Sequence, residues 1–439
     1  MPRSAPTRVL VVGGGHVGLT TTLRLLRRAR PGDLRVTVVD PRGYMTYHPF
    51  LPEAAAGSID ARNVVVSLRR SLSGVGDGAE VVTGDVVRLD HAQRRAVVRT
   101  GDGAERDLDY DVVVLAPGSV ARTAPVPGLA EHAVGFKTVE EAVHLRNHVL
   151  GPLDLAEAAT DPAVRERALT FVFVGGGYAG VEAVGELEDM ARYALRLHPG
   201  LTAADLRFVL VEATGRILPE VGEGLGRYAL GVLASRGIEV ALGTTMTSCT
   251  GGRVVLSDGR VFEAGTVVWT AGVKAHPVLE ATDLPLDEHH RLRVGADLRV
   301  QGVEGAWGAG DSAAVPDLTR PGATCAPNAQ HAVRQARRLA DNVLAVLRGG
   351  RPREYRHADV GSVASLGLHQ GVAELRGVRV RGYPAWLVHR LYHLSKVPTP
   401  SRKAGVLLGW VQAALFHREA VAMTALSHPF AEFERAARS

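Results

Sequence analysis

The sequence predicts an α/β fold in which one strand–turn–helix unit occurs twice. Each copy has an apolar run, the glycine pattern G-x-G-x-x-G and an apolar helical pattern, and its glycines are Gly13, Gly15 and Gly18 in the first copy and Gly175, Gly177 and Gly180 in the second. A further apolar strand follows each helix and ends in an acid, Asp40 in the first copy and Glu212 in the second. Two such units predict two mostly parallel sheets with helices on both faces.

Each part of this motif has a physical role in binding a dinucleotide. The glycines let backbone amides approach a pyrophosphate, the helix N-terminus attracts its charge, and the terminal acid accepts hydrogen bonds from ribose hydroxyls. A lone glycine pattern is weak evidence, whereas all the parts together are specific. Two sites in one chain indicate two nucleotides that face each other, such as FAD and a nicotinamide. The alternative, a decayed copy that only packs helix on strand, is disfavoured because both acids are present.

Length and composition narrow the class of protein. The 439 residues are enough for two or three domains with ample cores. No stretch reaches the roughly 20 apolar residues of a membrane span, and residues 1–7 lead directly into the first strand, so no targeting segment is expected. Only Cys249 and Cys325 are present, which excludes a disulfide framework and fits a cytosolic compartment.

Two further apolar strands end in short turns that contain glycine. Ala116 and Gly118 follow the apolar run 111–115, and Gly272 closes the run 267–272. Such a turn is expected where a buried strand ends and the chain crosses a ligand. The order of these strands predicts that the second unit is inserted in the first. The expected domains are the first part of one dinucleotide-binding domain at residues 1–125, a second dinucleotide-binding domain inserted in it at 126–290, the second part of the first domain at 291–375, and a C-terminal basic amphipathic membrane-association region at 376–439.

With these motifs the chain resembles the FAD-dependent pyridine-nucleotide-disulfide oxidoreductase superfamily, of the glutathione reductase type. Within it, the chain looks most like the type II NADH dehydrogenases, the non-pumping NADH:quinone oxidoreductases, and the likeness covers nearly the whole chain. The resemblance implies that the first fingerprint holds FAD, with Asp40 at the adenosine ribose and Asp311 at the ribitol chain. It implies that the second fingerprint binds NADH. The segment 47–53 with Gly57 resembles a family segment near the isoalloxazine.

The resemblance also points to residues around the reacting groups. Glu182 matches a glutamate that the family places close to the flavin and the nicotinamide, and Asn328, Ala329 and Gln330 match a helix start beside the flavin and the quinone. A helix that begins near Asn328 would aim free N–H groups at the flavin O2 edge and stabilise negative charge there. Structural alternatives remain open: an N-cap for Asn328, a helix-start acid paired with a backbone amide for Glu182, and a helix cap for Asp311.

Cysteine patterns that the sequence lacks restrict the class of electron acceptor. Neither cysteine has the spacing that disulfide reductases or sulfide:quinone oxidoreductases need, so electrons are expected to leave the flavin directly. Glu212 favours NADH because it repels a 2′-phosphate, although Arg216 nearby could weaken this preference. The family has a second Gln or Glu four residues after Gln330, where this chain has Arg334, and Gln335 follows one residue later. The acceptor could therefore be an unusual quinone or another molecule.

The C-terminal region is basic and apolar. Residues 376–418 contain eight Arg and Lys and no acid. The apolar run 404–416 is too short to span a bilayer, and with Trp386 and Trp410 it predicts helices that lie in an anionic membrane interface. The alternative is a helical hairpin packed on the flavin domain. His389 and His393 have the i, i+4 spacing of a zinc pair, but no third ligand is evident, so no metal site is expected.

Together these features predict an FAD-dependent NADH dehydrogenase that passes two electrons to a membrane quinone without proton pumping. It would lie at the cytoplasmic face of the cell membrane or in the cytoplasm, with quinone and an anionic membrane surface as partners and a homodimer as one further possibility; no nucleic acid is expected. Two alternatives stay open. One is a soluble NADH-dependent flavoprotein reductase with a non-quinone acceptor, which Arg334 motivates. The other is a redox-sensing binding protein that resembles apoptosis-inducing factor.

Overall fold

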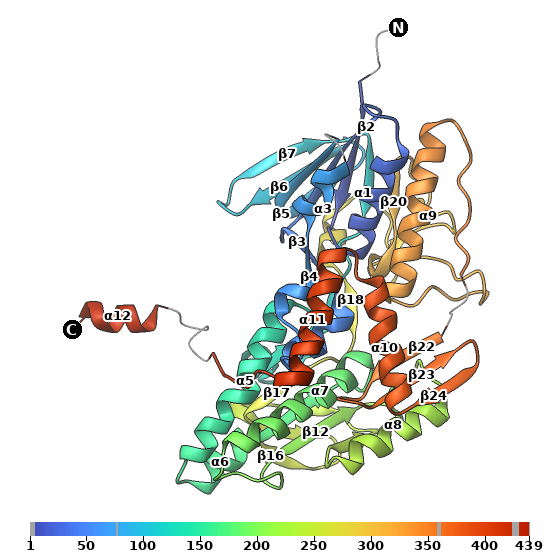
Figure 1. The fold of residues 1–439 in the computed structure, drawn as a ribbon. Helices are drawn as coiled ribbons and strands as arrows, with labels where there is room; N and C mark the ends of the chain where they lie inside the picture. The colour runs from blue at the N-terminus through green and yellow to red at the C-terminus, as the bar shows by residue number, and fades with distance from the viewer. Residues whose placement is uncertain (1–4, 76–77, 358–360, 424–429, 439) are drawn as a thin grey trace. The chain divides into compact units, whose positions relative to one another are not determined.

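The computed structural model describes residues 5–75, 78–357, 361–423 and 430–438. The chain forms two compact units, and each contains one of the two fingerprints (Figure 1). Unit 1 consists of Met1–Thr46, Val65–Val120 and Val273–Asp359. Unit 2 consists of Tyr47–Val64, Ala121–Gly272 and Val360–Ser439.

The main sheet of unit 1 has seven strands in the order β20-β8-β1-β2-β5-β6-β7. The first five strands pair in parallel, and the last two pairings are antiparallel. The bounds are β20 Ala306–Gly308, β8 Val112–Leu115, β1 Thr7–Val12, β2 Leu34–Asp40, β5 Ala79–Asp90, β6 Arg95–Thr100 and β7 Glu105–Asp109. The helices of this unit are α1 His16–Arg28, α3 Leu68–Leu72 and α9 Ala329–Leu347.

The position of β1 explains where the first fingerprint lies. Strand β1 pairs with β2 on one side and with the later strand β8 on the other, so the strand order reverses at β1. In open α/β sheets the crevice at such a reversal is where ligands bind, at the carboxyl ends of the strands. The glycine turn leaves β1 at that end and leads into α1. Helix α1 packs against α9, where the Thr21 hydroxyl donates to the carbonyl of Ala336 over 3.3 Å.

Unit 2 repeats this arrangement around a five-stranded parallel sheet in the order β10-β17-β11-β12-β13. Its bounds are β10 Ala133–Gly135, β17 Thr266–Trp269, β11 Thr170–Val174, β12 Arg207–Glu212 and β13 Glu239–Leu242. Here the order reverses at β11, the strand that precedes the second fingerprint. The helices are α2 Leu51–Ala55, α4 Leu129–His132, α5 Val139–Ala158, α6 Pro162–Ala168, α7 Tyr178–Ala194, α8 Glu223–Ser235, α10 Tyr383–Lys396, α11 Pro400–Phe416 and α12 Ala431–Arg438.

Shorter strands complete the two units. Two antiparallel three-stranded sheets in unit 2 are β14 Met246–Ser248, β15 Arg253–Leu256 and β16 Val261–Glu263, and β22 Gly361–Ser365, β23 Gly371–Leu375 and β24 Val378–Arg381. The remaining short strands are β3 Tyr44–Thr46, β4 Val65–Ser67, β9 Ser119–Ala121, β18 Val273–Ala275, β19 Leu292–Arg293 and β21 Ala313–Ala314.

The predicted α/β fold with two doubly wound sheets is confirmed, and the second sheet is built from residues between two segments of the first unit. The limits of the compact units differ from the expected domain boundaries. The first unit resumes at Val273 rather than at 291, and the strands of 361–375 group with unit 2. The reason is packing, because β22 and β23 contact α10, and β22 also contacts α7.

The C-terminal helices are fixed to unit 2 by a buried arginine. Arg390 of α10 lies with its guanidinium carbon 4.1 Å from the ring centre of Trp386 and 4.9 Å from that of Trp410. Its Nη2 is 3.2 Å from Oε2 of Glu53, which belongs to α2, and Trp410 Nε1 donates to the same carboxylate over 2.6 Å. Cation–π contacts and an ion pair therefore hold α2, α10 and α11 together.

This arrangement shows how the two tryptophans of the basic tail are held. Trp386 is only 6% exposed, and Trp410 is partly buried and donates to Glu53. Arg418 is also buried and donates to Oε2 of Glu186 over 3.0 Å. Two of the eight basic residues thus neutralise acids inside the fold, and those acids are more than 200 positions away in the sequence. The alternative expectation for the tail is a helical hairpin packed on the flavin domain. The structure has helices α10 and α11 packed within unit 2, which contains the second fingerprint.

Replacing Arg390 with alanine should strongly destabilise unit 2. The change leaves the buried Glu53 carboxylate without its counterion, and breaking a buried pair from one side lowers the free energy of unfolding by about 3–5 kcal/mol. Urea unfolding followed by tryptophan fluorescence measures this, because two of the four tryptophans flank the guanidinium. Arg402→Ala on α11 is the control and should change stability by less than about 0.5 kcal/mol. Equal stability of the two variants would contradict the prediction.

Candidate functional site

The first fingerprint forms a turn that only glycine fits. Gly13 has φ +98°, and a Cβ on it would run into the carbonyl of Ala116. A Cβ on Gly18 would run into the carbonyl of Gly13. Gly15, at the N-cap of α1, has open space where its side chain would be. The turn is therefore closed toward the sheet and open at the helix N-terminus, where amides can face an anion.

Asp40 is held against this turn. Its Oδ2 accepts the N–H of Gly14 over 2.6 Å, and its Oδ1 accepts the N–H of Arg42 over 2.8 Å. Burial raises the pKa of Asp40, although these two backbone donors oppose the effect. A carboxylate has about four acceptor positions, so two remain for further donors such as ribose hydroxyls.

The other predicted residues of unit 1 gather around the same turn. Ala116 ends β8 beside Gly13, and its N–H donates to the carbonyl of Val12 over 2.9 Å. Asp311 lies in a short 3-10 turn, where its Oδ2 accepts the hydroxyl of Ser119 over 2.6 Å. Gly118 has φ +77° and open space in the side-chain direction. Ser119 was missed from the sequence, because nothing local links it to a residue 192 positions away.

The histidine inside the fingerprint is uncharged near neutral pH. His16 is the first residue of α1, and burial lowers its pKa to about 4, with Asp311 opposing that effect. A neutral ring at this position leaves the helix N-terminus as the local source of positive potential.

The start of α9 is capped as the sequence suggested. Asn328 is the N-cap, and its Oδ1 accepts the N–H of His331 over 2.8 Å, so the helix proper begins at Ala329. Oε1 of Gln330 lies 3.1 Å from Nε2 of His357. His357 was missed from the sequence, since no motif marks it.

Helix α9 places the side chains of residues 334 and 335 in different surroundings. Arg334 turns back and donates from Nη1 to the carbonyl of Gln330 over 2.9 Å. Gln335 is only 1% exposed, and its Oε1 accepts the N–H of Gly310 over 2.8 Å. Gln335 therefore ties α9 to the turn that carries Asp311, while Arg334 covers the first turn of the helix.

The second fingerprint repeats the geometry of the first. Gly175 has φ +115°, a Cβ on Gly180 would run into the carbonyl of Gly175, and Gly177 at the N-cap of α7 has open space. The hydroxyl of Thr270 donates to the carbonyls of Val174 and Gly175, and so joins the end of β17 to this turn. Gly272 follows two residues later with φ +92°.

Glu212 occupies the position that Asp40 has in unit 1. Its Oε2 accepts the N–H of Gly176 over 2.6 Å, and its Oε1 accepts the N–H of Thr214 over 2.7 Å. The guanidinium of Arg216 instead donates to the backbone carbonyls of Leu218 and Val221. These bonds direct the arginine away from an ion pair with Glu212.

Glu182 lies one turn into α7 and is 7% exposed. Its Oε1 accepts the N–H of Ser365 over 3.0 Å, and the same oxygen is 3.0 Å from Nε2 of His389 on α10. The backbone partner anticipated as the structural alternative is therefore present. The histidine is an additional partner that sequence reasoning missed, because its i, i+4 pattern with His393 suggested only a metal pair.

Both cysteines are buried, and Cys249 lies in the apolar core of unit 2, where burial raises the pKa of its thiol. The described residues contain no group of three His, Cys, Asp or Glu side chains placed to bind a metal ion.

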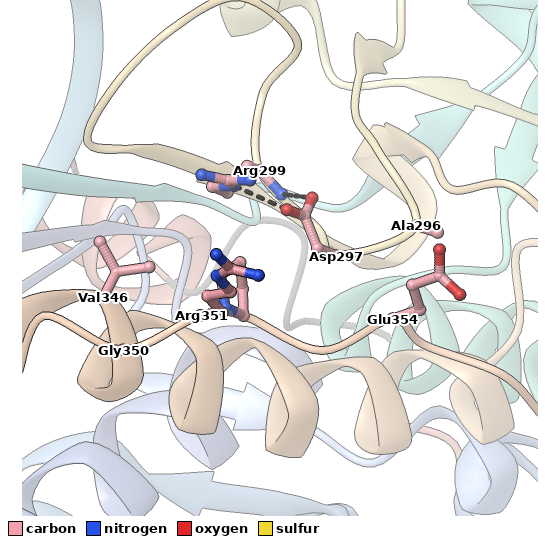
Figure 2. A pocket seen from close by; sticks show the side chains of 8 residues that line it. Ala296, Asp297, Arg299, Val346, Gly350, Arg351 and Glu354 are labelled. Carbon is pink, nitrogen blue, oxygen red and sulfur yellow. Dashed lines mark hydrogen bonds and ion pairs between the residues drawn. The ribbon is translucent and has the colours of Figure 1, made fainter.

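Unit 1 contains a cavity of about 580 Å³ (Figure 2). It is lined by the segment after α9 and by residues around Asp297, whose carboxylate accepts Nε of Arg299 over 2.6 Å. None of the residues singled out from the sequence lines this cavity.

Comparison with known proteins identifies the family. The model of the pyridine nucleotide-disulphide oxidoreductase family matches residues 7–336. A type II NADH:quinone oxidoreductase of Staphylococcus aureus is 30% identical, over 86% of this chain and 92% of that protein. One from Mycobacterium tuberculosis is 29% identical over 95% and 91%. The structure of NDH2 from Plasmodium falciparum in complex with NADH has the same fold, with a TM-score of 0.87 at 16% identity, over 94% of this chain and 99% of that one.

Two glycine turns of one design, each backed by an acid, define a protein with two dinucleotide-binding folds. The chain belongs to the pyridine nucleotide-disulphide oxidoreductase family and, within it, to the type II NADH:quinone oxidoreductases.

Proposed function

We propose that this protein is an FAD-dependent NADH dehydrogenase that transfers two electrons from NADH to a quinone. The observation that carries the proposal is the duplicated turn, in which Asp40 and Glu212 each accept the second amide of a glycine fingerprint. The relatives with full-length matches are named NADH:quinone oxidoreductases, which supports the same activity.

The residues of unit 1 fit FAD. The turn excludes any side chain at Gly13 and Gly18 but is open at Gly15, as a bound pyrophosphate requires. Asp40 has acceptor positions left for a ribose, and Asp311 is anchored by Ser119 for the ribitol hydroxyls. When bound, FAD supplies the redox chemistry, because its isoalloxazine accepts a hydride and passes on two electrons.

The chain's own residues bind and orient the reactants. In unit 2, Gly177 and Glu212 are the proposed contacts of the NADH pyrophosphate and ribose, with Gly272 at the adjoining strand end. Glu182 is proposed as the carboxylate close to the nicotinamide. In unit 1, the capped N-terminus at Asn328 and Ala329 would stabilise negative charge, and Gln330 would contact the acceptor.

Purified protein should be yellow, release FAD on denaturation and oxidise NADH rapidly with quinones under anaerobic conditions. The measurement is NADH consumption with a panel of quinones and of soluble acceptors. Colourless protein that FAD cannot reconstitute would overturn the proposal. Rapid turnover with soluble acceptors alone would instead support the soluble reductase that Arg334 suggested. Slow turnover with every acceptor would support a redox sensor.

Glu212→Gln should narrow the preference for NADH over NADPH. The carboxylate accepts hydrogen bonds from the ribose hydroxyls of NADH and repels the 2′-phosphate of NADPH. Losing a hydrogen bond to a charged group weakens binding by roughly 1.5–3 kcal/mol. The ratio of kcat/KM values should therefore fall by about 10-fold or more. Glu239→Gln on the neighbouring strand is the control, because Glu239 pairs with Arg207 at the other strand end. A wild type that prefers NADPH would show that Glu212 has been misinterpreted.

The proposed membrane contact lies on the outer faces of α10 and α11. Among the described residues, no helix has the length and apolarity needed to cross a bilayer. The two helices nonetheless expose large apolar side chains, of which Leu408 and Leu415 are each 68% exposed and Phe416 is 77% exposed. Leu387, Leu391, Leu407 and Val411 are also exposed. Lys396, Arg402 and Lys403 flank this apolar face, and their charge favours an anionic lipid surface.

Leu408→Glu combined with Leu415→Glu should release the protein from anionic vesicles. Each inserted leucine contributes roughly 1.5–3 kcal/mol, so binding should weaken by well over 10-fold. Vesicle sedimentation measures the change. Leu155→Glu on α5 is the control, since that leucine is also exposed, at 54%, on another helix of unit 2. Unchanged sedimentation of the double variant would contradict the prediction. Dissociation of a dimer in that variant would assign the face to a second copy of the chain.

A further inference from the structure

Arg334 lies near the start of α9 without an acid to balance its charge. The side chain is half-buried, and its Nη1 donates over 2.9 Å to the backbone carbonyl of Gln330. None of the acids in the described ranges forms an ion pair with it. A guanidinium has five N–H donors, so this bond uses only one of them. A half-buried charge of this kind is favourable only when water or an anion completes its hydrogen bonds.

The acid of α9 itself is engaged with another helix. Asp341 is the only acid between residues 329 and 347, whereas the helix contains three arginines. The carboxylate of Asp341 is 2.7 Å from Nε of Arg24 and 2.9 Å from Nη1 of Arg28, both on α1. The first turn of α9 contains no acid either. The positive charge at the start of α9 is therefore not compensated within the helix.

Other hydrogen-bonding groups gather at the same helix start in unit 1. Nε2 of His357 is 3.1 Å from Oε1 of Gln330, so the segment after α9 returns to the beginning of that helix. The return is anchored by a buried pair, in which the hydroxyl of Tyr355 is 2.9 Å from Nδ1 of His331. Long helical side chains point back toward the helix N-terminus, as Arg334 does. The region around Gln330 thus combines a guanidinium, an imidazole and the positive end of a helix dipole.

We propose that Arg334 selects an acceptor that carries negative charge, namely a quinone bearing an ionised acidic group such as a carboxylate. This inference rests on the proposed function, in which Gln330 contacts the acceptor. A planar guanidinium binds such a group through two parallel hydrogen bonds, which a neutral substituent cannot accept. The reaction is NADH + H⁺ + quinone → NAD⁺ + quinol, and the acidic group keeps its charge throughout. Arg334 is a specificity-determining residue that binds this substituent.

The direct test compares two quinones that share one ring system. Menadione carries a neutral methyl group on a naphthoquinone ring, and naphthoquinone sulfonate carries a permanent negative charge at the same ring position. Arg334→Gln removes the positive charge and keeps a polar side chain that favours a helix. The ratio of kcat/KM for the sulfonate to that for menadione should fall by about 10-fold or more, the loss expected for a charge-assisted hydrogen bond. The difference in reduction potential between the quinones cancels, because it is the same for both proteins.

Arg337→Gln is the matched control. Arg337 is exposed on the same helix, so the change removes the same charge from the protein without removing the bond to the Gln330 carbonyl. The control should keep the ratio within about 2-fold of the wild type, since exposed charges are screened by salt. Arg334→Lys should lose part of the preference, because lysine keeps the charge but not the paired donors.

Two further readouts separate binding from electron transfer. The loss in Arg334→Gln should appear in KM with kcat retained, because the substituent is bound equally before and during the reaction. Naphthalene sulfonate has the same charge and a similar ring but cannot be reduced. Calorimetric titration of the FAD-loaded protein should show that it binds the wild type about 10-fold more tightly than Arg334→Gln.

The outcomes separate the two proposals. A wild type that reduces neither quinone overturns the proposed function. Rapid menadione reduction, with the same ratio in the wild type and in Arg334→Gln, overturns selection by Arg334 alone. Equal loss of activity with both quinones in Arg334→Gln also overturns it, since that pattern reports only a structural role at the helix start. An equal fall of the ratio in Arg334→Gln and Arg337→Gln overturns it as well, because general surface charge then explains the preference.

Discussion

The ion pair between Arg390 and Glu53 is the contact on which the organisation of unit 2 depends. It joins α2 from the early part of the chain to α10 and α11 from its end, and two tryptophan rings enclose it. A buried pair gains little net free energy when it forms, because both groups lose their hydration, but either group alone would be highly unfavourable. The contact therefore specifies which segments pack together more than it adds to overall stability. Glu182 and His389 lie in the same neighbourhood and depend on that packing.

The two glycine turns have the same local geometry in both units. In each unit the strand order reverses at the strand that precedes the glycines, and the acid at the end of the next strand accepts the second glycine amide. The acids are thus oriented before a ligand arrives, which lowers the ordering entropy of binding. The units differ around this shared core. Unit 1 adds the capped start of α9 and the Asp311 turn, whereas unit 2 adds the buried charges.

The sequence was sufficient for the features that depend on local patterns. The glycine spacings and apolar runs predicted both sheets, and Asn328 predicted the start of α9, because a cap and its helix are adjacent in the chain. Contacts between distant residues could not be predicted. Trp386 and Trp410 carry no sign that they will contact Arg390 and, for Trp410, Glu53. An acid-free basic stretch suggests a surface that binds anions, but in the fold two of its arginines pair with acids from distant parts of the chain. Gln335 is a similar case, since only the fold shows that it bonds Gly310.

The enclosure of Arg390 by two indole rings also constrains how this sequence can diverge. A change at residue 53 or 390 alone leaves one buried charge uncompensated, whereas apolar replacements at both positions can be neutral or stabilising. The two positions should therefore change together among related chains. Loss of the guanidinium would also empty the space between the rings, so we expect the double replacement to include a long apolar side chain such as methionine at residue 390. Covariation between these positions, which are 337 residues apart, would show from sequences alone that the tail packs against α2.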